Sequence, residues 1–241
     1  MKNSKVFHSI HEYSCGEGIL GLNIYKGSFI YKYPLLTIGL NSYSLSASIV
    51  YNSTYKTSDF GGRTIGFGNG WKVDIEEYLF PYNSSYNLDG FNNLDYVFID
   101  NNWNIHRFVR YTQSSGYEDA TNVYYDESGT GLRLVIKANH NPIIYDELKN
   151  MYIFQNERLV EIISSINSTI SKKIVYSNNH ISSFYDNRKQ NRRICFNYSN
   201  DSLISINNTL TNQNYTFEYD NQKFKKIIVN YGLNAYSAGH C

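Results

Sequence analysis

The sequence contains few of the residues that favour α-helices and no excess of charge of either sign. Of its 241 residues, only 5 are Ala and 2 are Met, and both are strong helix formers. Lys and Arg together number 22, against 21 for Asp and Glu. A chain so close to neutral lacks the basic footprint of a nucleic-acid-binding protein and the charge that would bind it to an acidic membrane surface.

Long apolar runs and cysteines are also scarce. No stretch approaches the roughly 20 apolar residues that span a bilayer, and residues 1–13 are too polar for the apolar part of a signal peptide. We therefore expect a soluble chain with no membrane insertion and no export signal. Because Cys15, Cys195 and Cys241 lie far apart, we expect free thiols rather than a metal site or a disulfide framework, and no cofactor.

Aromatic and turn-forming residues are abundant instead. The chain has 24 Tyr and 13 Phe, and it also has 31 Asn and 26 Ser. Tyr and Phe fit the pleated surface of a sheet, whereas Asn and Ser favour the turns between strands. This composition predicts an all-β protein with many tight turns, long enough for one large domain or two small ones.

A repeat of about 22 residues occupies the last third of the chain. Four aromatic residues, which we call leaders, are separated by steps of 22, 22 and 21 residues, and each is followed by apolar residues five and eight positions later. Such a period over four copies indicates an array of similar structural units. The repeat positions are Phe154, Leu159 and Ile162, then Tyr176, Ile181 and Phe184, then Tyr198, Leu203 and Ile206, and finally Tyr219, Phe224 and Ile227.

Each unit has the pattern of a β-hairpin. Before the leaders, apolar and polar residues alternate, as in Ile194, Phe196 and Tyr198, which is typical of a strand with one buried face. Four polar residues follow each leader and predict a turn, after which a second strand begins at the fifth position. A second polar connection, such as residues 186–191 or 207–212, leads to the next unit. A lone hairpin is marginally stable, so we expect the units to join into one continuous antiparallel sheet.

The preceding part of the chain has the same character with less regular spacing. Strand–turn–strand patterns cover residues 96–108 and 124–136, residues 45–51 alternate as a strand, and no convincing amphipathic helix is present. Glycines cluster before Trp71, where the chain must turn tightly or let another backbone approach, so we interpret Trp71, Gly70 and Gly90 as structural anchors. The predicted division is an N-terminal extension over residues 1–35, a leading β region over 36–150 and hairpin repeats with a short tail over 151–241.

The repeats resemble the YD repeats of bacterial RHS-repeat proteins. The resemblance also includes Gly66-Phe-Gly-Asn-Gly-Trp71, Leu88-Asp-Gly90 and Tyr125-Asp-Glu-Ser-Gly-Thr-Gly-Leu-Arg-Leu134, and it extends from about residue 40 to about residue 230. Members of this family, like the related toxin-complex subunits and teneurins, form a curved, spiralling β-sheet shell from such hairpins. In bacterial members the shell commonly encloses a toxic C-terminal domain. The resemblance therefore implies an all-β shell of consecutive antiparallel hairpins and a secreted or cell-surface location.

This sequence departs from the family pattern at its C-terminal end. No position matches the self-cleavage motif of the family, so the family's autoproteolytic residues cannot be transferred, and we expect no toxin domain after Tyr231. We expect a shell segment without chemistry of its own, whose open sheet edge near residues 227–231 self-associates or pairs with the rest of an RHS shell or another chain, with a toxin as possible cargo. The alternative is an adhesion module that binds carbohydrate or a surface through exposed aromatic residues.

Two clusters of charged residues were weighed as sites. Asp74, Glu76 and Glu77 follow Trp71 at a spacing that a glycosidase could use, but acids on a strand are more often its solvated face. Arg188, Lys189, Arg192 and Arg193 could contact phosphate, but we interpret them as a charged inter-hairpin loop that protects a sheet edge from aggregation. Trp71 and Trp103 are expected to be core residues, and the prediction is that the protein is not an enzyme.

Overall fold

The structure is a computed structural model that is all-β. The residues it describes are 10–15, 17–23, 28–39, 44–55, 57–63, 65–67, 70–86, 88, 95–110, 122–211, 213–221 and 223–230. They form two antiparallel sheets, and the only helical turn among them is the 3-10 helix η2 (Thr57–Phe60). This described part includes no helix with the length and apolar character needed to cross a membrane. The all-β fold with antiparallel pairing confirms the coarse part of the fold prediction.

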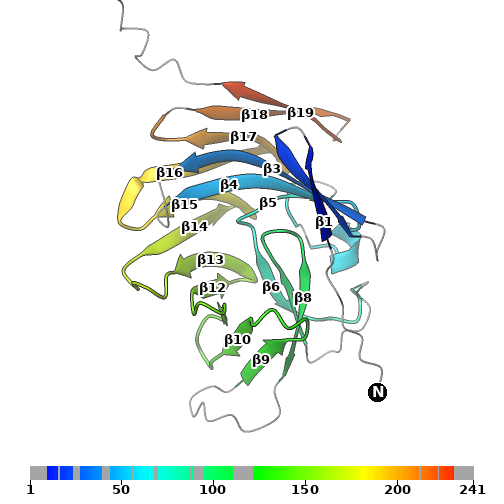
Figure 1. The fold of residues 1–241 in the computed structure, drawn as a ribbon, viewed down its shortest axis with the longest axis vertical. Coiled ribbons are helices and arrows are strands. Elements are labelled where there is room, and N and C mark those ends of the chain that lie inside the picture. The colour runs from blue at the N-terminus through cyan, green and yellow to red at the C-terminus, as the bar shows by residue number, and fades with distance from the viewer. Residues whose placement is uncertain are drawn as a thin grey trace, which may run out of the picture.

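The smaller sheet contains five strands from the first third of the chain (Figure 1). In spatial order its strands are β1 (Ile10–Cys15), β2 (Gly18–Asn23), β3 (Ser28–Ile38), β4 (Leu45–Asn52) and β5 (Trp71–Val73). The predicted strand over residues 45–51 is thus β4. The predicted boundary between residues 35 and 36 falls inside β3.

The larger sheet contains all the remaining strands, fourteen in number. In chain order these are β6 (Tyr78–Pro81), β7 (Tyr96–Ile99), β8 (Ile105–Arg110), β9 (Asn122–Asp126), β10 (Arg133–Ile136), β11 (Ile143–Tyr145), β12 (Met151–Gln155), β13 (Arg158–Ile163), β14 (Ser171–Ser177), β15 (His180–Asp186), β16 (Lys189–Ser199), β17 (Ser202–Asn208), β18 (Asn214–Asp220) and β19 (Lys223–Asn230). The predicted boundary between residues 150 and 151 therefore lies within one sheet.

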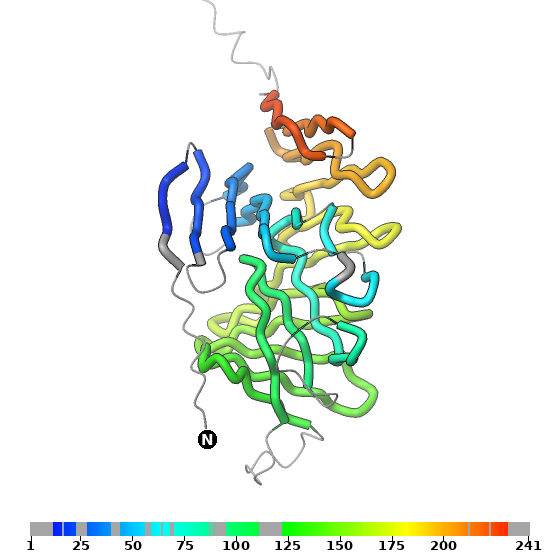
Figure 2. The backbone as a smooth tube through the Cα atoms, turned by 90° about the vertical axis from the view of Figure 1, so that its right-hand side faces the viewer, coloured from blue at the N-terminus to red at the C-terminus, as the bar shows by residue number. Residues whose placement is uncertain are grey.

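Strands β6 to β13 close into a ring of eight strands. Neighbours in the chain pair one after another, and the ring is completed because β13 pairs with both β12 and β6, the latter through Arg158 and Tyr78. Aromatic side chains fill the interior of the eight-stranded ring. There the centre of the Phe98 phenyl group lies 6.1 Å from that of Phe108 and 5.9 Å from that of Phe154. This closure was not predicted from the sequence. From the ring, β14 to β19 continue as an open stack of strands (Figure 2).

The four repeats form the hairpins β12–β13, β14–β15, β16–β17 and β18–β19. In each one the leader lies directly opposite the apolar residue five positions later, as Tyr198 lies opposite Leu203. In each one the register then shifts by one residue, because the sixth position after the leader, for example Ile204, is a β-bulge. The extra residue explains the spacing of five and eight, since a strict two-residue alternation would have placed the next inward residue at position seven.

Two residues, not the predicted four, make the turn in each of the first three hairpins. In the first three repeats both turn residues have positive φ, with values of 49° and 68° at Asn178 and Asn179 and of 47° and 62° at Asn200 and Asp201. Two-residue turns with left-handed backbone match the twist of paired strands, and Asn adopts that backbone more readily than most residues. The prediction of longer turns was wrong because the strands continue one residue past each leader. This geometry accounts for part of the Asn excess.

The connection predicted as a charged loop is also shorter than expected. Only Asn187 and Arg188 form the turn after β15, and β16 begins at Lys189. Arg192 and Arg193 therefore lie in a strand rather than in a loop. The Asp186 carboxylate shapes the turn by accepting hydrogen bonds from the Arg188 backbone N–H and guanidinium.

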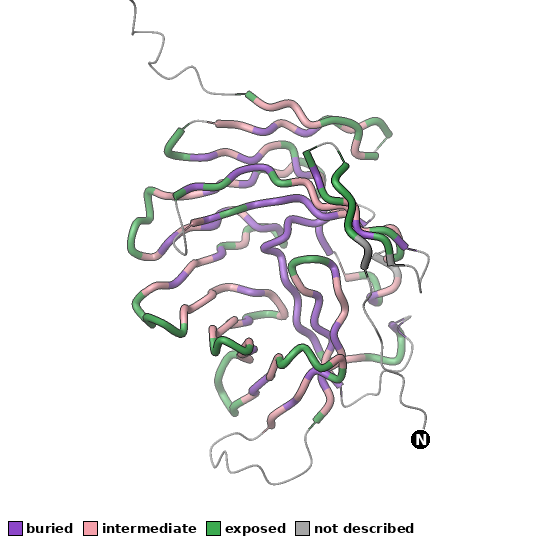
Figure 3. Tube along the Cα trace, in the orientation of Figure 1, coloured by how far each residue is buried: buried purple, intermediate pink, exposed green. Residues whose placement is uncertain are grey.

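The main core lies between the two sheets and continues into the ring. Strands β3 and β4 lie across the inner face of the stack, and β4 contacts β15 and β16 (Figure 1). Burial follows this arrangement, because β4 is almost wholly buried, whereas the exposed side chains Tyr13 and Ile19 lie on β1 and β2 (Figure 3). A second core on the outer side of β6 and β7 contains Val50, Phe60 and Trp103.

The left-handed turns make a prediction for stability. Replacing Asn179, where φ is 68°, with Val should lower the free energy of unfolding by roughly 1–2 kcal/mol, because a β-branched residue is strained there. Asn179→Gly should be neutral or stabilising. Asn191→Val is the matched control on the exposed part of strand β16 and should stay within about 0.5 kcal/mol of the parent. Equal losses for the two Val variants in urea denaturation would contradict this geometry.

Candidate functional site

The glycine-rich segment and Trp71 join the small sheet to the last hairpin. Gly70 has φ of 81°, and a side chain there would come within 2.5 Å of the Asn52 carbonyl oxygen. The half-buried Trp71 ring lies 5.0 Å from Tyr51 and 4.8 Å from Phe224. Close backbone approach thus lets Trp71 contact a strand about 150 residues later in the chain. Gly90, the third predicted anchor, lies outside the described residues.

The three acids considered as catalytic groups are buried, so the interpretation as a solvated strand face was wrong. Asp74, Glu76 and Glu77 are 8%, 1% and 6% exposed and lie in the connection between β5 and β6. The connection wraps around Lys72, which is fully buried and donates from Nζ to the Glu76 carbonyl oxygen at 3.0 Å. Burying an ammonium group is costly without partners, and these backbone oxygens and carboxylates provide them.

Two carboxylates of this segment, those of Asp74 and Glu76, have structural partners. Asp74 accepts from the Ser48 backbone N–H at 3.0 Å and lies 3.4 Å from Lys32 Nζ, and Glu76 accepts from the Val73 N–H at 3.1 Å. Burial raises the pKa of Glu77 to about 8, although the nearby Lys72 opposes the shift. Because these groups are covered by protein, the arrangement holds the β5–β6 connection rather than offering acids to a substrate.

A second buried charged group lies within the eight-stranded ring. His106 is 5% exposed, with Nδ1 at 3.2 Å from the Asp126 carboxylate and Nε2 at 3.3 Å from the Asp100 carboxylate. Burial alone would lower the pKa of His106, but the two carboxylates outweigh it and raise the pKa to about 9. The hydrogen bonds also keep the pKa values of Asp100 and Asp126 below their usual range, against the effect of burial. This is a stable ion triad in which both imidazole nitrogens are occupied.

The two acids of the triad also close the adjacent turns. Asp100 accepts from the backbone N–H groups of Asn102 and Asn104, and Asp126 accepts from those of Ser128 and Thr130. The triad was not predicted from the sequence. Its signal was present in the two turn sequences, where an Asp is followed by Asn, Ser or Thr two and four residues later, a pattern that favours side-chain capping of a turn.

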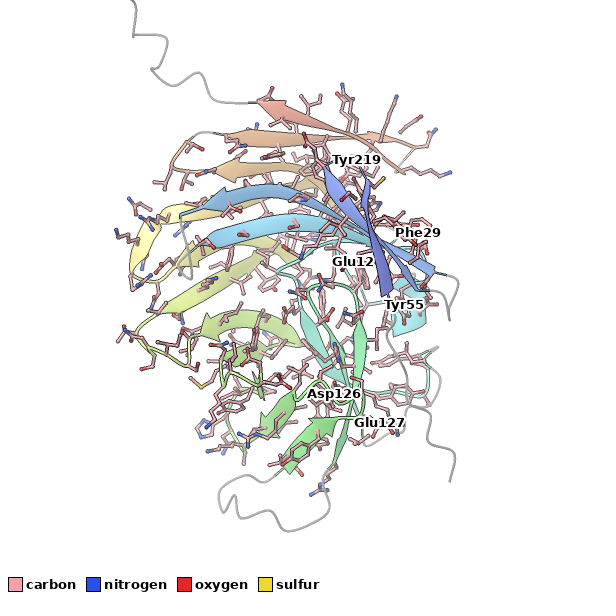
Figure 4. The ribbon with its side chains drawn as sticks, in the orientation of Figure 1. Glu12, Phe29, Tyr55, Asp126, Glu127 and Tyr219 are labelled. Carbon is pink, nitrogen blue, oxygen red and sulfur yellow. The ribbon has the colours of Figure 1, made fainter. Side chains whose placement is uncertain are left out.

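The leaders of the repeat face the core rather than solvent. Phe154 is 1% exposed, and Tyr176, Tyr198 and Tyr219 are partly buried against the same core. The Tyr219 hydroxyl donates to the Leu203 carbonyl oxygen at 2.8 Å, which links neighbouring hairpins. Tyr219 lies toward the far end of the stack, whereas Asp126 of the ion triad lies in the ring (Figure 4). The leaders thus act as packing residues within the described structure.

A groove of about 780 Å³ runs along the turns of the first two hairpins. Tyr78 and Ile174 are buried in its lining, and Arg158 reaches across to the Asn179 carbonyl oxygen with its guanidinium 5.2 Å from the Tyr176 ring centre. The other lining residues are mostly polar or charged side chains of β12 to β15 and their turns: Arg63, Gln155, Asn156, Glu157, Val160, Lys173, Val175, Ser177, Asn178 and Tyr185. None of the three acids considered for catalysis is among them.

Burial of the repeat positions changes along the stack. The apolar residues five positions after the leader, Leu159, Ile181 and Leu203, are all 0% exposed, and at eight positions Phe184 and Ile206 are 2% and 0% exposed. Ile162, beside the ring, is half-buried, and so are both positions of the last hairpin, Phe224 and Ile227. Within the described chain, β19 pairs only with β18, so the last hairpin has a neighbour on one side.

Cysteines and metal-binding groups add no further site to the described residues. Cys15 is exposed and Cys195 is half-buried, and both carry free thiols, whereas Cys241 lies outside the described part. In that part, no three His, Cys, Asp or Glu side chains are placed to hold a metal ion. Comparison with known proteins gives no match, either to a protein-family model or to a curated protein.

The ion triad predicts a pH dependence of stability. Because the pKa of His106 is raised from 6.5 to about 9, its stabilising contribution is complete below pH 6.5 and is lost as the pH rises towards 9. The loss should be about 3 kcal/mol, at about 1.4 kcal/mol for each pH unit of that window. His106→Asn should flatten this part of the stability profile measured by urea unfolding, and exposed His140→Asn should leave it unchanged. A slope that survives in His106→Asn would count against the triad.

Proposed function

We propose that the chain is a structural segment of a β-sheet shell of the kind formed by RHS-repeat proteins, with no chemistry of its own. The observation that carries the proposal is that four consecutive hairpins repeat one packing arrangement within a single sheet, with leader opposite fifth residue and a bulge after it. Such units are stabilised by their neighbours and can continue in series. In this proposal Trp71, Gly70 and Gly90 anchor the leading region to the repeats.

The burial of charged groups supports a structural role. Asp74 and Glu76 near Trp71, like the Asp–His–Asp triad, are buried and hydrogen-bonded to protein groups, so they serve the fold. The partner in this proposal is the remainder of an RHS shell or another chain, which joins the outer edge of β19. The assembly would contribute to encapsulation and delivery of a toxin cargo or to a cell-surface scaffold, and its location would be secreted or cell-surface.

Extending the array by one unit tests this proposal. A copy of residues 209–230 inserted after Asn230 should stack on β19 and bury Phe224 and Ile227. In the parent, Phe224→Ala should cost less than the roughly 3 kcal/mol expected for Leu203→Ala, because Phe224 is half-buried. In the extended chain the cost of Phe224→Ala should rise to at least that of Leu203→Ala, as measured by urea denaturation.

The matched control carries the same insertion with its copies of Tyr215, Phe217 and Tyr219 replaced by Ser. This control removes the inward aromatic row and should leave the cost of Phe224→Ala at its parental value. If the cost of Phe224→Ala is the same with the intact insertion as with the control, the hairpins do not stack in series and the proposed shell function is rejected.

The groove supports a second candidate function, a carbohydrate-binding adhesion module. Its lining combines the partly exposed rings of Tyr176 and Tyr185 with the exposed amides of Asn156 and Asn178, the chemistry with which proteins stack on and hydrogen-bond to sugars. Its volume of about 780 Å³ is sufficient for a short oligosaccharide. In this candidate function, the saccharide would contact turn residues and aromatic residues of the groove rather than the inward-facing leaders as a group.

Glycan binding can be measured with a pair of matched variants. If the groove binds saccharide, Asn178→Ala should weaken the affinity by about 5-fold, because the exposed Asn178 amide lines the groove and a hydrogen bond contributes about 0.5–1.5 kcal/mol. Asn200→Ala is the matched control at the equivalent turn position, with φ of 47° against 49°, and should bind like the parent because Asn200 lies outside the groove lining. Absence of saturable binding on a glycan array and in calorimetry would remove this candidate.

A further inference from the structure

Strand β19, at the outer edge of the stack, has mainly apolar side chains on its inward face and lysines on its outward face. Its inward row consists of Phe224, Ile227 and Val229, which lie opposite Tyr219, Phe217 and Tyr215 of β18. Its outward row includes two lysines, because Lys223 lies opposite Asp220 and Lys226 opposite Glu218. A strand that joins this edge would meet an apolar row on one face and a basic row on the other.

The inward row lacks the cover that the same row has elsewhere in the stack. In the preceding hairpin, Ile206 is completely buried and lies opposite Tyr215 of the next strand. In the hairpin before that, Phe184 is 2% exposed and lies opposite Ile194 of the next strand. Ile227, at the equivalent position in β19, is half-buried. A further strand with a large apolar side chain opposite Ile227 would restore the arrangement of the earlier repeats.

The outward row determines the charge of that strand. Lys223, Lys225 and Lys226 are all exposed, and Lys225 occupies the bulge. Opposite charges on neighbouring strands are favourable, whereas like charges directly opposite are destabilising. Lysines on an exposed edge also discourage pairing with a second copy of the same edge, which is a common protection against aggregation. The row therefore fits acidic side chains on the added strand.

We propose that β19 accepts, by antiparallel strand addition, a strand of another polypeptide that has large apolar side chains inward and Asp or Glu outward. Strand β18 is an example within this chain, since Tyr215, Phe217 and Tyr219 face inward while Glu218 and Asp220 face outward towards the lysines. The edge is thus selective for charge as well as for shape. The inference rests on the proposed function, since it names the chemistry of the strand that continues the sheet.

A peptide with the sequence of β18, Asn214–Asp220, is a suitable probe, and its control carries Lys in place of Glu218 and Asp220. Titration of the labelled peptides with the full chain, followed by fluorescence anisotropy, should show saturable binding of the acidic peptide and at least 10-fold weaker binding of the lysine peptide. The chain variant with Lys223→Glu and Lys226→Glu should reverse this preference. That variant places like charges opposite Asp220 and Glu218, so its melting temperature should fall. The control variant with Lys223→Gln and Lys226→Gln only removes the charge at two exposed positions, so it should keep the parental melting temperature and lose the preference between the two peptides.

Hydrogen exchange locates the bound peptide. The acidic peptide should slow exchange of the amides of residues 223–230 and leave those of β1, the edge of the small sheet, unchanged. Four results would each overturn the inference. Two concern hydrogen exchange: protection away from β19 when the peptide is bound, or protection of β19 in a dimer of the free chain. The other two concern affinity: equal binding of the acidic and lysine peptides, or no binding of either. If the inserted repeat raises the cost of Phe224→Ala but neither peptide binds, the shell function stands and only the proposed chemistry of the added strand is wrong. If the acidic peptide binds but the inserted repeat has no such effect, the shell function alone is rejected.

Discussion

The β-bulge after each leader is the constraint on which the repeat array depends. A hairpin with a two-residue turn and uninterrupted alternation would place inward residues five and seven positions after the leader. The sequence has its apolar residues at five and eight, and the extra residue at six brings the second of them back to the core face. Without the bulge, Ile162, Phe184, Ile206 and Ile227 would turn outward. The bulge therefore keeps one more apolar residue of each second strand on the face that packs against the core.

The sequence allowed prediction of the elements that depend on local patterns. The four repeat hairpins, the hairpins within residues 96–108 and 124–136 and strand β4 all form where alternation and turn residues indicated them. The predicted length of the turns was wrong, because the polar residues on either side of each turn pair with one another as the ends of the two strands. For Asn178 and Asn179, composition indicates a turn, but only the backbone shows that these two residues alone make it.

The ring and the buried charges could not be predicted because they arise from contacts between distant segments. A single pairing of Tyr78 with Arg158 closes the ring, and no periodicity marks these residues. The acids after Trp71 were expected to be solvated because alternation of polar and apolar residues predicts only which face of a strand is exposed. It does not predict that a connection between strands surrounds the ammonium group of Lys72. Lys72 is buried by segments on both sides of the connection, so its environment exists only in the folded chain. The shell architecture itself remains a proposal based on the repeat.

The small sheet covers the stack with residues made long before the strands they pack against. The Tyr215 hydroxyl donates to the Leu35 carbonyl oxygen across 180 positions of sequence, and Phe67 packs on Phe217 with ring centres 6.4 Å apart. During synthesis, the apolar face of β3 and β4 therefore emerges from the ribosome well before its cover is made. Non-local pairing of this kind slows folding and leaves intermediates open to aggregation. The repeat hairpins, which are synthesised last, thus supply the cover for the apolar face of β3 and β4.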